Sequence, residues 1–450
     1  MRLLLVRPPR RNVQDAGLGV PPLGLAYIAA AAREAGHGVE ILDAYVQNLS
    51  WTRFEAEIAR RRPDAVGLTV MTPMVDVVAR AVQVVRPYTG LVAIGGPHPT
   101  AVGQAAFEDL PGIDITVEGE GETVIAPVLT WWEAGAIGTP PDGSRVAGSA
   151  FTPSKPPSDL RSLPFPARDL LPQAAYRYLF ATRRGFATMI TSRGCPFACS
   201  FCDKSVSGSR WRARPADHVV DEMEMLARTG TGFINFYDDN FTLQRKRVIA
   251  ICEEILRRGL DVHWKCEGRV DSVDLPMLRL MRRAGCRVVA YGVESANEDT
   301  LALLRKDIRV DQVRGAFEDT RSAGLRSLAY MILGAPGEDE AAVRRSVAFC
   351  REIGADYVQF SSLVAMPGTP LFQQHRTSAS VKNPLDGDLS RATLTDMDEA
   401  ELSQLMRQAW SDFYLRPRPL ARLARDAWTS GSFGEAMRLG RALGRWTLAA

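Results

Sequence analysis

Residues 191–204 read Thr-Ser-Arg-Gly-Cys-Pro-Phe-Ala-Cys-Ser-Phe-Cys-Asp-Lys and place Cys195, Cys199 and Cys202 in a C-x3-C-x2-C pattern within one loop. Three thiolates this close together indicate a metal site. A mononuclear zinc site would normally add a fourth Cys or His at matching spacing, but the nearest histidine, His218, lies sixteen residues after the last thiol. Soft thiolates suit an iron–sulfur cluster, and three thiolates on four irons leave one iron open to an outside ligand.

The composition is that of an ordinary globular protein. The chain has 450 residues, of which 46% are apolar and 24% charged, and this length predicts two or three domains. The remaining cysteines lie singly on apolar stretches, which favours reduced thiols and a cytoplasmic location; they are Cys252, Cys266, Cys286 and Cys350. The longest apolar stretch, Val20–Ala32, is too short to span a bilayer, and a net charge of +3 does not indicate a nucleic-acid partner.

Residues 1–136 predict a doubly wound, Rossmann-like α/β domain, because short apolar strands alternate with amphipathic helices. The expected elements are Leu3–Val6, Leu23–Ala35, Val39–Leu42, Phe54–Arg61, Ala65–Val70, Val75–Val85 and Val92–Ile94. Such a sheet binds ligands outside the carboxyl ends of its strands. The ligand loops would therefore be residues 7–24, 69–74, 95–100 (GGPHPT) and 118–122 (EGEGE), and none carries a phosphate-binding glycine motif.

Residues 137–180 predict a proline-rich linker, and residues 181–375 predict a partial (β/α)6 barrel. The expected strands are Phe186–Ile190, Phe233–Tyr237, Val262–Cys266, Val288–Gly292, Leu328–Leu333 and Val358–Leu363. Barrel enzymes place their chemistry on the loops that follow the strands. There, Asp238 and Glu294 could accept from an ammonium or a ribose, Arg269 could pair with a carboxylate, and Gly334 would admit an adenine.

Residues 376–450 predict a helical C-terminal tail. Apolar residues recur at helical spacing over 397–414, so this helix should pack against the rest of the protein. A basic stripe follows, with Trp428 and Trp446 among its arginines, which are Arg416, Arg418, Arg422, Arg425, Arg438, Arg441 and Arg445. It could meet an anionic substrate or a membrane surface, but a solvated face is the expected role.

The cysteine pattern resembles that of the radical S-adenosylmethionine (SAM) superfamily, in which the open iron of a 4Fe-4S cluster chelates S-adenosylmethionine. Phe201 matches the aromatic position beside the adenine, Glu294-Ser295 the fourth-strand motif, and Gly334–Glu338 the fifth. Asp238 stands where many members carry a Gly-Gly-Glu run. The resemblance thus implies a SAM site at Phe201, Asp238, Arg269, Glu294, Ser295 and Gly334.

The GGPHPT and EGEGE loops resemble those of the cobalamin-binding domains that precede many radical SAM barrels. Glycines there would let a flat macrocycle approach the backbone. The implied cobalamin residues are Thr69, Met71, Thr72, Gly95, Gly96, His98, Glu118, Gly119, Glu120 and Gly121. The chain lacks the D-x-H-x-x-G motif that supplies a histidine ligand to cobalt, so cobalamin without histidine ligation is expected. A degenerate domain without cobalamin is the alternative.

The resemblance implies an enzyme that methylates an unactivated carbon of a small-molecule substrate, using a 5′-deoxyadenosyl radical and methylcobalamin. It would need an electron donor such as flavodoxin or ferredoxin, and no nucleic acid. One alternative is a non-methylating radical reaction, such as the oxidative cyclisation of the anaerobic porphyrin cyclase. Another is a cobalamin sensor in which the cluster is structural.

Methyl transfer would require the two sets of strand ends to oppose each other, because both parallel sheets bind ligands at their carboxyl ends. We therefore expect Gly95, His98 and Glu120 to face Cys199, Glu294 and Gly334 across one shared cavity.

Replacing Cys195, Cys199 and Cys202 together with Ala should abolish the broad visible absorption of the reconstituted cluster. The matched control replaces Cys252, Cys286 and Cys350, none of which shares a loop with another cysteine. If the control lost the iron and the first variant kept it, the assignment of the cysteine loop would be wrong.

Overall fold

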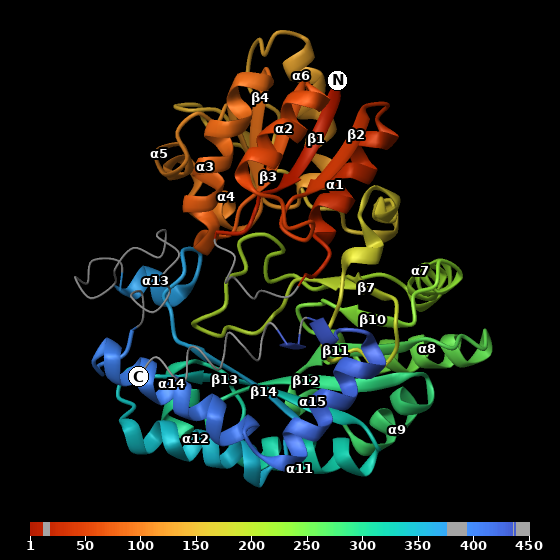
Figure 1. Ribbon diagram of the computed structural model, residues 1–450, viewed down its shortest axis with the longest axis vertical. Helices are drawn as coiled ribbons and strands as arrows, with labels where there is room; N and C mark the ends of the chain where they lie inside the picture. The colour runs from red at the N-terminus through yellow and green to blue at the C-terminus, as the bar shows by residue number, and fades with distance from the viewer. Residues whose placement is uncertain (12–18, 376–393, 435, 438–450) are drawn as a thin grey trace.

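The computed structural model describes residues 1–11, 19–375, 394–434 and 436–437. Two α/β units stack end to end, with the first above the second in Figure 1 and the connecting chain crossing between them in yellow. Among the described residues, no helix is both long and apolar enough to cross a membrane.

The first unit is a doubly wound sheet, as predicted. Its strands have the order β2-β1-β3-β4-β5-β6, and all neighbours are parallel except β5 and β6. Its elements are β1 (Arg2–Arg7), α1 (Leu23–Glu34), β2 (Gly38–Asp43), α2 (Trp51–Arg61), β3 (Ala65–Thr69), α3 (Val75–Val85), β4 (Leu91–Gly95), α4 (Pro97–Val102), α5 (Ala106–Asp109), β5 (Ile115–Val117), α6 (Ile125–Glu133) and β6 (Ser144–Arg145). The strand order reverses at β1 and β3, and an open sheet of this kind binds its ligand at that switch point.

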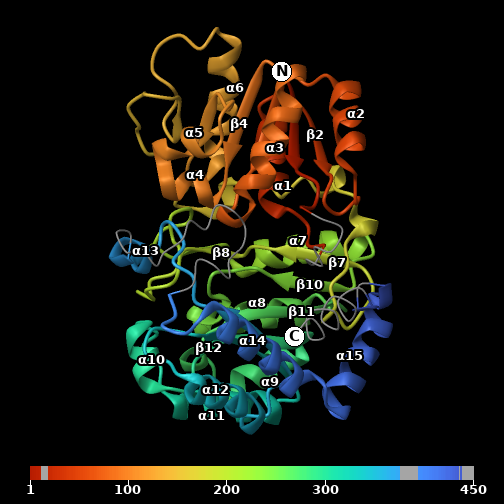
Figure 2. The ribbon, with the colours of Figure 1, turned by 60° about the vertical axis from the view of Figure 1, so that its left-hand side comes forward.

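The second unit is a partial barrel. Its six strands are parallel and stand in the order β7-β10-β11-β12-β13-β14. The elements are β7 (Phe186–Met189), α7 (Ala216–Arg228), β10 (Phe233–Phe236), α8 (Arg245–Arg257), β11 (His263–Gly268), α9 (Leu275–Arg283), β12 (Cys286–Glu294), α10 (Glu298–Leu303), α11 (Val310–Ser322), β13 (Arg326–Leu333), α12 (Glu340–Glu352) and β14 (Tyr357–Ser362). The helices cover the outer face of the sheet, where one apolar core joins them to the strands (Figure 2).

The chain that connects the two units packs against both of them. It first adds β6 to the first sheet, and Ala167 later donates its backbone N–H to Ala26 of α1 over 2.9 Å. Farther on, Tyr176 is buried and donates its hydroxyl to Asp43 at the end of β2, over 2.8 Å. Arg168 pairs with the buried Glu222 of α7 in the barrel. This chain therefore contributes side chains to the packing of both units.

A helix of the C-terminal segment packs on the barrel, as predicted. Helix α14 (Glu399–Tyr414) buries Leu402, Leu405, Ala409 and Phe413, and it contacts α12 and β14. Helix α15 (Pro417–Ser430) follows, and its buried Asp426 pairs with Arg326 of β13. Of the expected basic stripe, Arg422 pairs with Asp356, whereas Arg438, Arg441, Arg445 and Trp446 lie outside the described residues.

Replacing Tyr176 with Phe should lower the free energy of unfolding by about 1–3 kcal/mol, because the buried Asp43 carboxylate would lose a hydrogen bond without regaining water. Burial already raises the pKa of Asp43. Urea denaturation measures the loss. The control, Tyr88→Phe, removes a hydroxyl that bonds the exposed Glu55, and it should change stability by no more than about 0.5 kcal/mol. Equal effects of the two variants would contradict a structural role for the Tyr176–Asp43 bond.

Candidate functional site

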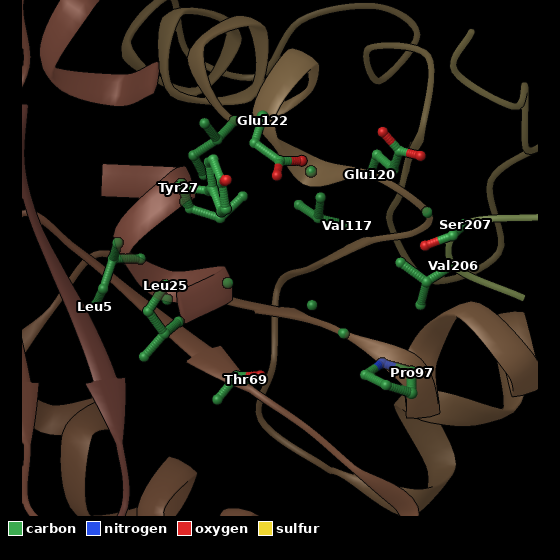
Figure 3. A pocket seen from close by; sticks show the side chains of 18 of the residues that line it. Leu5, Leu25, Tyr27, Thr69, Pro97, Val117, Glu120, Glu122, Val206 and Ser207 are labelled. Atoms are coloured by element: carbon green, nitrogen blue, oxygen red, sulfur yellow. The ribbon is translucent and has the colours of Figure 1, made fainter. Parts of the chain in front are cut away.

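A cavity of about 320 Å³ lies between the two units. Its first wall comes from strand ends and loops of the first sheet, including Thr69, Gly95, Gly96 and residues 119–122. Its second wall comes from the barrel, including the ends of β7 and β10 and residues 206–207. In Figure 3, Leu5, Leu25 and Tyr27 stand on one side of this space, and Pro97, Val206 and Ser207 stand on the other. The expected apposition of the two sets of strand ends is therefore present for β7 and β10.

Glycines shape the wall of the first sheet, as the sequence predicted. Gly96 has a φ of +106°, and a Cβ there would lie 3.0 Å from the Val70 carbonyl oxygen. A Cβ on Gly119 would meet no atom within 4 Å, so a side chain at this position would project into open space. Bare backbone beside an apolar cavity fits a large flat ligand that lies against the strand ends. Thr69, Gly95, Gly96, Gly119, Glu120 and Gly121 all line it.

Four predicted cobalamin residues lie elsewhere. His98 is fully buried, and its two ring nitrogens bond Thr72 Oγ1 (3.2 Å) and Asp109 Oδ2 (3.1 Å), so neither nitrogen faces the cavity. Thr72 is held in the same contact. Glu118 is buried against Arg145, and Met71 is 49% exposed away from the cavity lining. The prediction that His98 faces the cysteines was wrong, because its ring completes a buried hydrogen-bond network.

A buried charge cluster joins the two units at the edge of the cavity. Glu120 pairs with Arg193 over 2.8 Å and with Arg212, and Glu122 pairs with Arg193 over 2.5 Å. The glutamates belong to the EGEGE loop, Arg193 comes two residues before Cys195, and Arg212 lies on the strand opposite it. These strands are β8 (Ser192–Arg193) and β9 (Arg212–Ala213), an antiparallel pair. Glu120 therefore holds the cysteine loop against the first sheet in addition to lining the cavity.

The cysteine loop is fixed from several sides. Gly194 donates its N–H to Asp239 Oδ2 over 2.7 Å, Ser200 donates to the Leu304 carbonyl over 2.9 Å, and the Arg269 guanidinium stacks 3.6 Å from the Phe197 ring centroid. Asp239 also lines the cavity. One loop thus presents three thiols while its backbone is anchored to the barrel.

The three thiols fit ligands of a cluster rather than of a single ion. None forms a disulfide, and Cys199 is buried while Cys195 and Cys202 are half-buried. No three His, Cys, Asp or Glu side chains of the described chain converge closely enough to hold one metal ion. A cluster binds each thiolate through a different iron, so it accepts wider spacing. Burial raises the pKa of Cys199, and it raises that of Cys202 to about 11; a metal cluster bound here would supply the positive charge that favours the thiolate forms.

A buried ion pair stands beside Cys199 and Phe201. Lys306 Nζ lies 2.6 Å from Glu294 Oε1 and 5.8 Å from the Phe201 ring centroid, and both charged groups act on the Cys199 thiol. Glu294 is the last residue of β12, with a φ of +67°. An ammonium, a carboxylate and an aromatic ring close to the cysteines suit a zwitterionic ligand with an adenine.

Four predicted SAM residues are engaged in other contacts. Asp238 accepts from the Thr191 N–H (2.6 Å), the Thr191 hydroxyl (2.5 Å) and the Ser192 hydroxyl (2.6 Å), so it organises the start of the cysteine loop. Ser295 donates to Glu338, which also accepts from the Gly334 N–H. Arg269 pairs with Asp271. We expected Cys199, Glu294 and Gly334 to face the interdomain cavity. None of the three is among the residues that line it.

Sequence reasoning missed Arg193, Asp239, Tyr237 and Lys306. Arg193 stood within the quoted cysteine motif and Asp239 directly follows the predicted ligand Asp238, and this place beside predicted ligands was the available signal. Lys306 follows α10 between Arg305 and Asp307, which both have positive φ, and no pattern in the sequence marks that turn.

Comparisons with known proteins match both units. Residues 10–129 match the model of the B12 binding domain, and residues 189–350 match that of the radical SAM superfamily. The chain is 32% identical over 440 residues to an uncharacterized methyltransferase of Pyrococcus horikoshii, covering 93% of this chain and 94% of that protein. It is 29% identical over 395 residues to the anaerobic magnesium-protoporphyrin IX monomethyl ester cyclase of Rubrivivax gelatinosus, covering 83% of this chain and 70% of the cyclase.

Among solved structures, the chain resembles the cobalamin-dependent S-adenosylmethionine radical enzyme OxsB, with aqua-cobalamin and S-adenosylmethionine bound. The TM-score is 0.76 at 17% identity, and the match covers 97% of this chain and 71% of OxsB. At this identity the likeness shows a shared fold.

Replacing Glu120 with Ala should lower the free energy of unfolding by about 3–5 kcal/mol, because two buried guanidinium groups would lose a carboxylate. Urea denaturation gives the value. In the control, Glu57→Ala, a partly exposed carboxylate that pairs with Arg60 and Arg61 is removed, and the loss should stay within about 1 kcal/mol. A small effect at Glu120 would mean that the charge cluster does not hold the two units together.

Proposed function

The chain belongs to the radical S-adenosylmethionine enzymes that carry a cobalamin-binding domain, and from this premise we propose that it methylates an unactivated carbon of a small-molecule substrate. One observation carries the proposal: the residues on either side of the three-cysteine segment, Ser192 and Arg193 before it and Val206 and Ser207 after it, line the same cavity as the glycines of the first sheet, and Arg193 pairs there with Glu120. The match to the Pyrococcus methyltransferase over nearly the whole length of both chains supports it.

Each cofactor has residues that fit it. Cys195, Cys199 and Cys202 would ligate the 4Fe-4S cluster. Lys306, Glu294 and Phe201 would receive the charged end and the adenine of S-adenosylmethionine. Thr69, Gly95, Gly96, Gly119 and Gly121 would form the surface for cobalamin. When bound, these groups together supply a carbon-centred radical and a transferable methyl group.

The protein's own residues fix the positions of the two sites. The bonds from Thr191, Ser192 and Gly194 to Asp238 and Asp239 fix where the cysteine loop begins. The Glu120–Arg193 pair fixes that loop relative to the first sheet. Reacting atoms must approach within about 3–3.5 Å, so loops anchored on both sides of one cavity serve transfer between two bound groups. We further propose a small one-electron donor protein, such as flavodoxin or ferredoxin, as partner.

The second candidate is a radical reaction without methyl transfer. The 29% identity to the Rubrivivax cyclase favours it, because the alignment includes both units. The two candidates require the same cofactor residues, so they differ only in whether the product gains a methyl group.

Cells that produce the wild-type protein and grow on methionine with a trideuterated methyl group should accumulate a metabolite that carries this label. The metabolite should be absent from cells that produce the Cys195, Cys199 and Cys202 triple alanine variant. Mass spectrometry of small-molecule extracts measures the label. A wild-type protein that releases 5′-deoxyadenosine and forms a new but unlabelled product would support the non-methylating reaction instead.

A further inference from the structure

On β10 and β11 the inner face of the barrel carries charged and polar side chains. Paired residues on neighbouring parallel strands share a face of the sheet, so Asn235 on β10 and Lys265 on β11 lie side by side, and Glu267 lies two residues beyond Lys265. The alternate residues, such as Phe236 and Cys266, pack into the outer core beneath the helices. Barrel interiors are normally filled by branched aliphatic residues. This polar inner face therefore requires an explanation.

Lys265 and Glu267 form an ion pair inside the barrel. Lys265 is 1% exposed, and its Nζ also donates to Asn235 Oδ1 over 3.4 Å. Tyr330 of β13 donates its hydroxyl to Glu267 Oε1 over 3.3 Å. Burial lowers the pKa of Lys265, but the Glu267 charge and hydrogen bond together with Tyr330 and Tyr237 outweigh burial and raise it, so Lys265 is charged. A buried ion pair of this kind seldom adds net stability.

Three buried polar atoms of this cluster lack a hydrogen-bond partner among the described residues. They are Glu267 Oε2, Asn235 Nδ2 and Thr188 Oγ1. Buried polar atoms are nearly always paired, so an unpaired carboxylate oxygen in this place points to a missing donor. Lys265 and Tyr330 both donate to Oε1 of Glu267, so Oε2 is left without a donor.

Aromatic side chains lie beside this cluster, and one of them lines the cofactor cavity. Tyr178 contacts Phe180 edge-on, and the Phe180 and Tyr357 ring centroids are 4.6 Å apart. Tyr237, which lines the interdomain cavity, is 41% exposed. Tyr178 and Tyr237 both interact electrostatically with Glu267. The Glu267 side chain is 19% exposed while Oε2 itself is covered, so a ligand that reaches the exposed part of this side chain meets Oε2 after a rotation of the carboxylate about its soft terminal torsion.

We propose that Glu267 is a specificity-determining residue that binds the substrate, and that Oε2 accepts a hydrogen bond from an uncharged hydroxyl or amide N–H group. The inference rests on the proposed function and names its substrate class: a small molecule with an apolar body, for the neighbouring aromatic rings, and one neutral donor group. Lys265, Asn235 and Tyr330 are positioning residues for Glu267. An anionic group is rejected, because it would meet the Glu267 carboxylate while the Lys265 ammonium is already bound to it.

The test removes the pair without leaving an unpaired charge. Lys265→Met/Glu267→Leu replaces both members with apolar side chains, a change that is often neutral or stabilising for a buried pair. The control, Arg245→Met/Asp274→Leu, removes an exposed pair whose nitrogen and oxygen are 2.6 Å apart. Thermal unfolding and the visible absorption of the reconstituted cluster establish that both variants are intact.

Ligand binding is measured on the full chain with reconstituted cluster and cobalamin, by saturation-transfer NMR. The probes are benzyl alcohol and benzamide, which carry a neutral donor group. Toluene, which has no donor group, and benzoate, which is anionic, are their counterparts. The wild-type protein and the control should give signals for the alcohol and the amide at least threefold above those for toluene and benzoate, and the Lys265/Glu267 variant should lose this preference. Equal signals for benzoate and benzamide in the wild type, or an unchanged preference in the double variant, would overturn the proposal.

If the double variant does not fold, Glu267→Gln answers the same question. Glutamine keeps the size of the side chain but adds a donor and removes the charge, so the benzoate signal should rise relative to that of benzamide. An unchanged ratio would overturn the proposal. The trideuteromethyl experiment is independent of these probes: a protein that selects the neutral donors but transfers no label contradicts the proposed methylation and leaves the recognition by Glu267 standing.

Discussion

The ion pairs of Glu120 with Arg193 and Arg212 are the contact on which the functional arrangement depends. They join the EGEGE loop of the first sheet to the two strands that flank the cysteine loop. Taking three charges out of water is costly, so these pairs contribute little net stability relative to an apolar contact. Their contribution is specificity, because each guanidinium is satisfied only when the two units meet in this one orientation.

A series of hydrogen bonds extends from that contact into the barrel. Gly194, next to Arg193, donates to Asp239, and Thr191 and Ser192 donate to Asp238. Asp238 and Asp239 are adjacent residues after β10, so one strand end fixes both the beginning and the glycine of the cysteine loop. Displacing the first unit would therefore strain the three-cysteine loop, and the positions of this loop and of the glycine-lined wall are coupled through Arg193 and its neighbours.

The strand pattern could be read from the sequence because parallel strands are short apolar runs bounded by glycine and polar residues. All six barrel strands and the glycine loops of the first sheet lie where the pattern predicts them. Side-chain direction could not be read in the same way. His98 and Asp238 stand in the predicted loops, yet their side chains bond Thr72 and Thr191. The sequence does not distinguish these cases, because a loop side chain can hydrogen-bond to a neighbouring residue as readily as to a ligand. Lys306 was missed because tertiary packing alone brings it to Glu294.

The end of β10 combines the two requirements of the enzyme. Asp238 and Asp239, in the loop after the strand, hold the cysteine loop, whereas Asn235 within the strand faces the barrel interior together with Lys265. Tyr237 lies between these sets and lines the cofactor cavity. Because a strand alternates its side chains, the inward residues can change without disturbing the loop contacts. The barrel can therefore acquire a new substrate while the cysteine loop, the charge cluster and the glycine wall remain as they are.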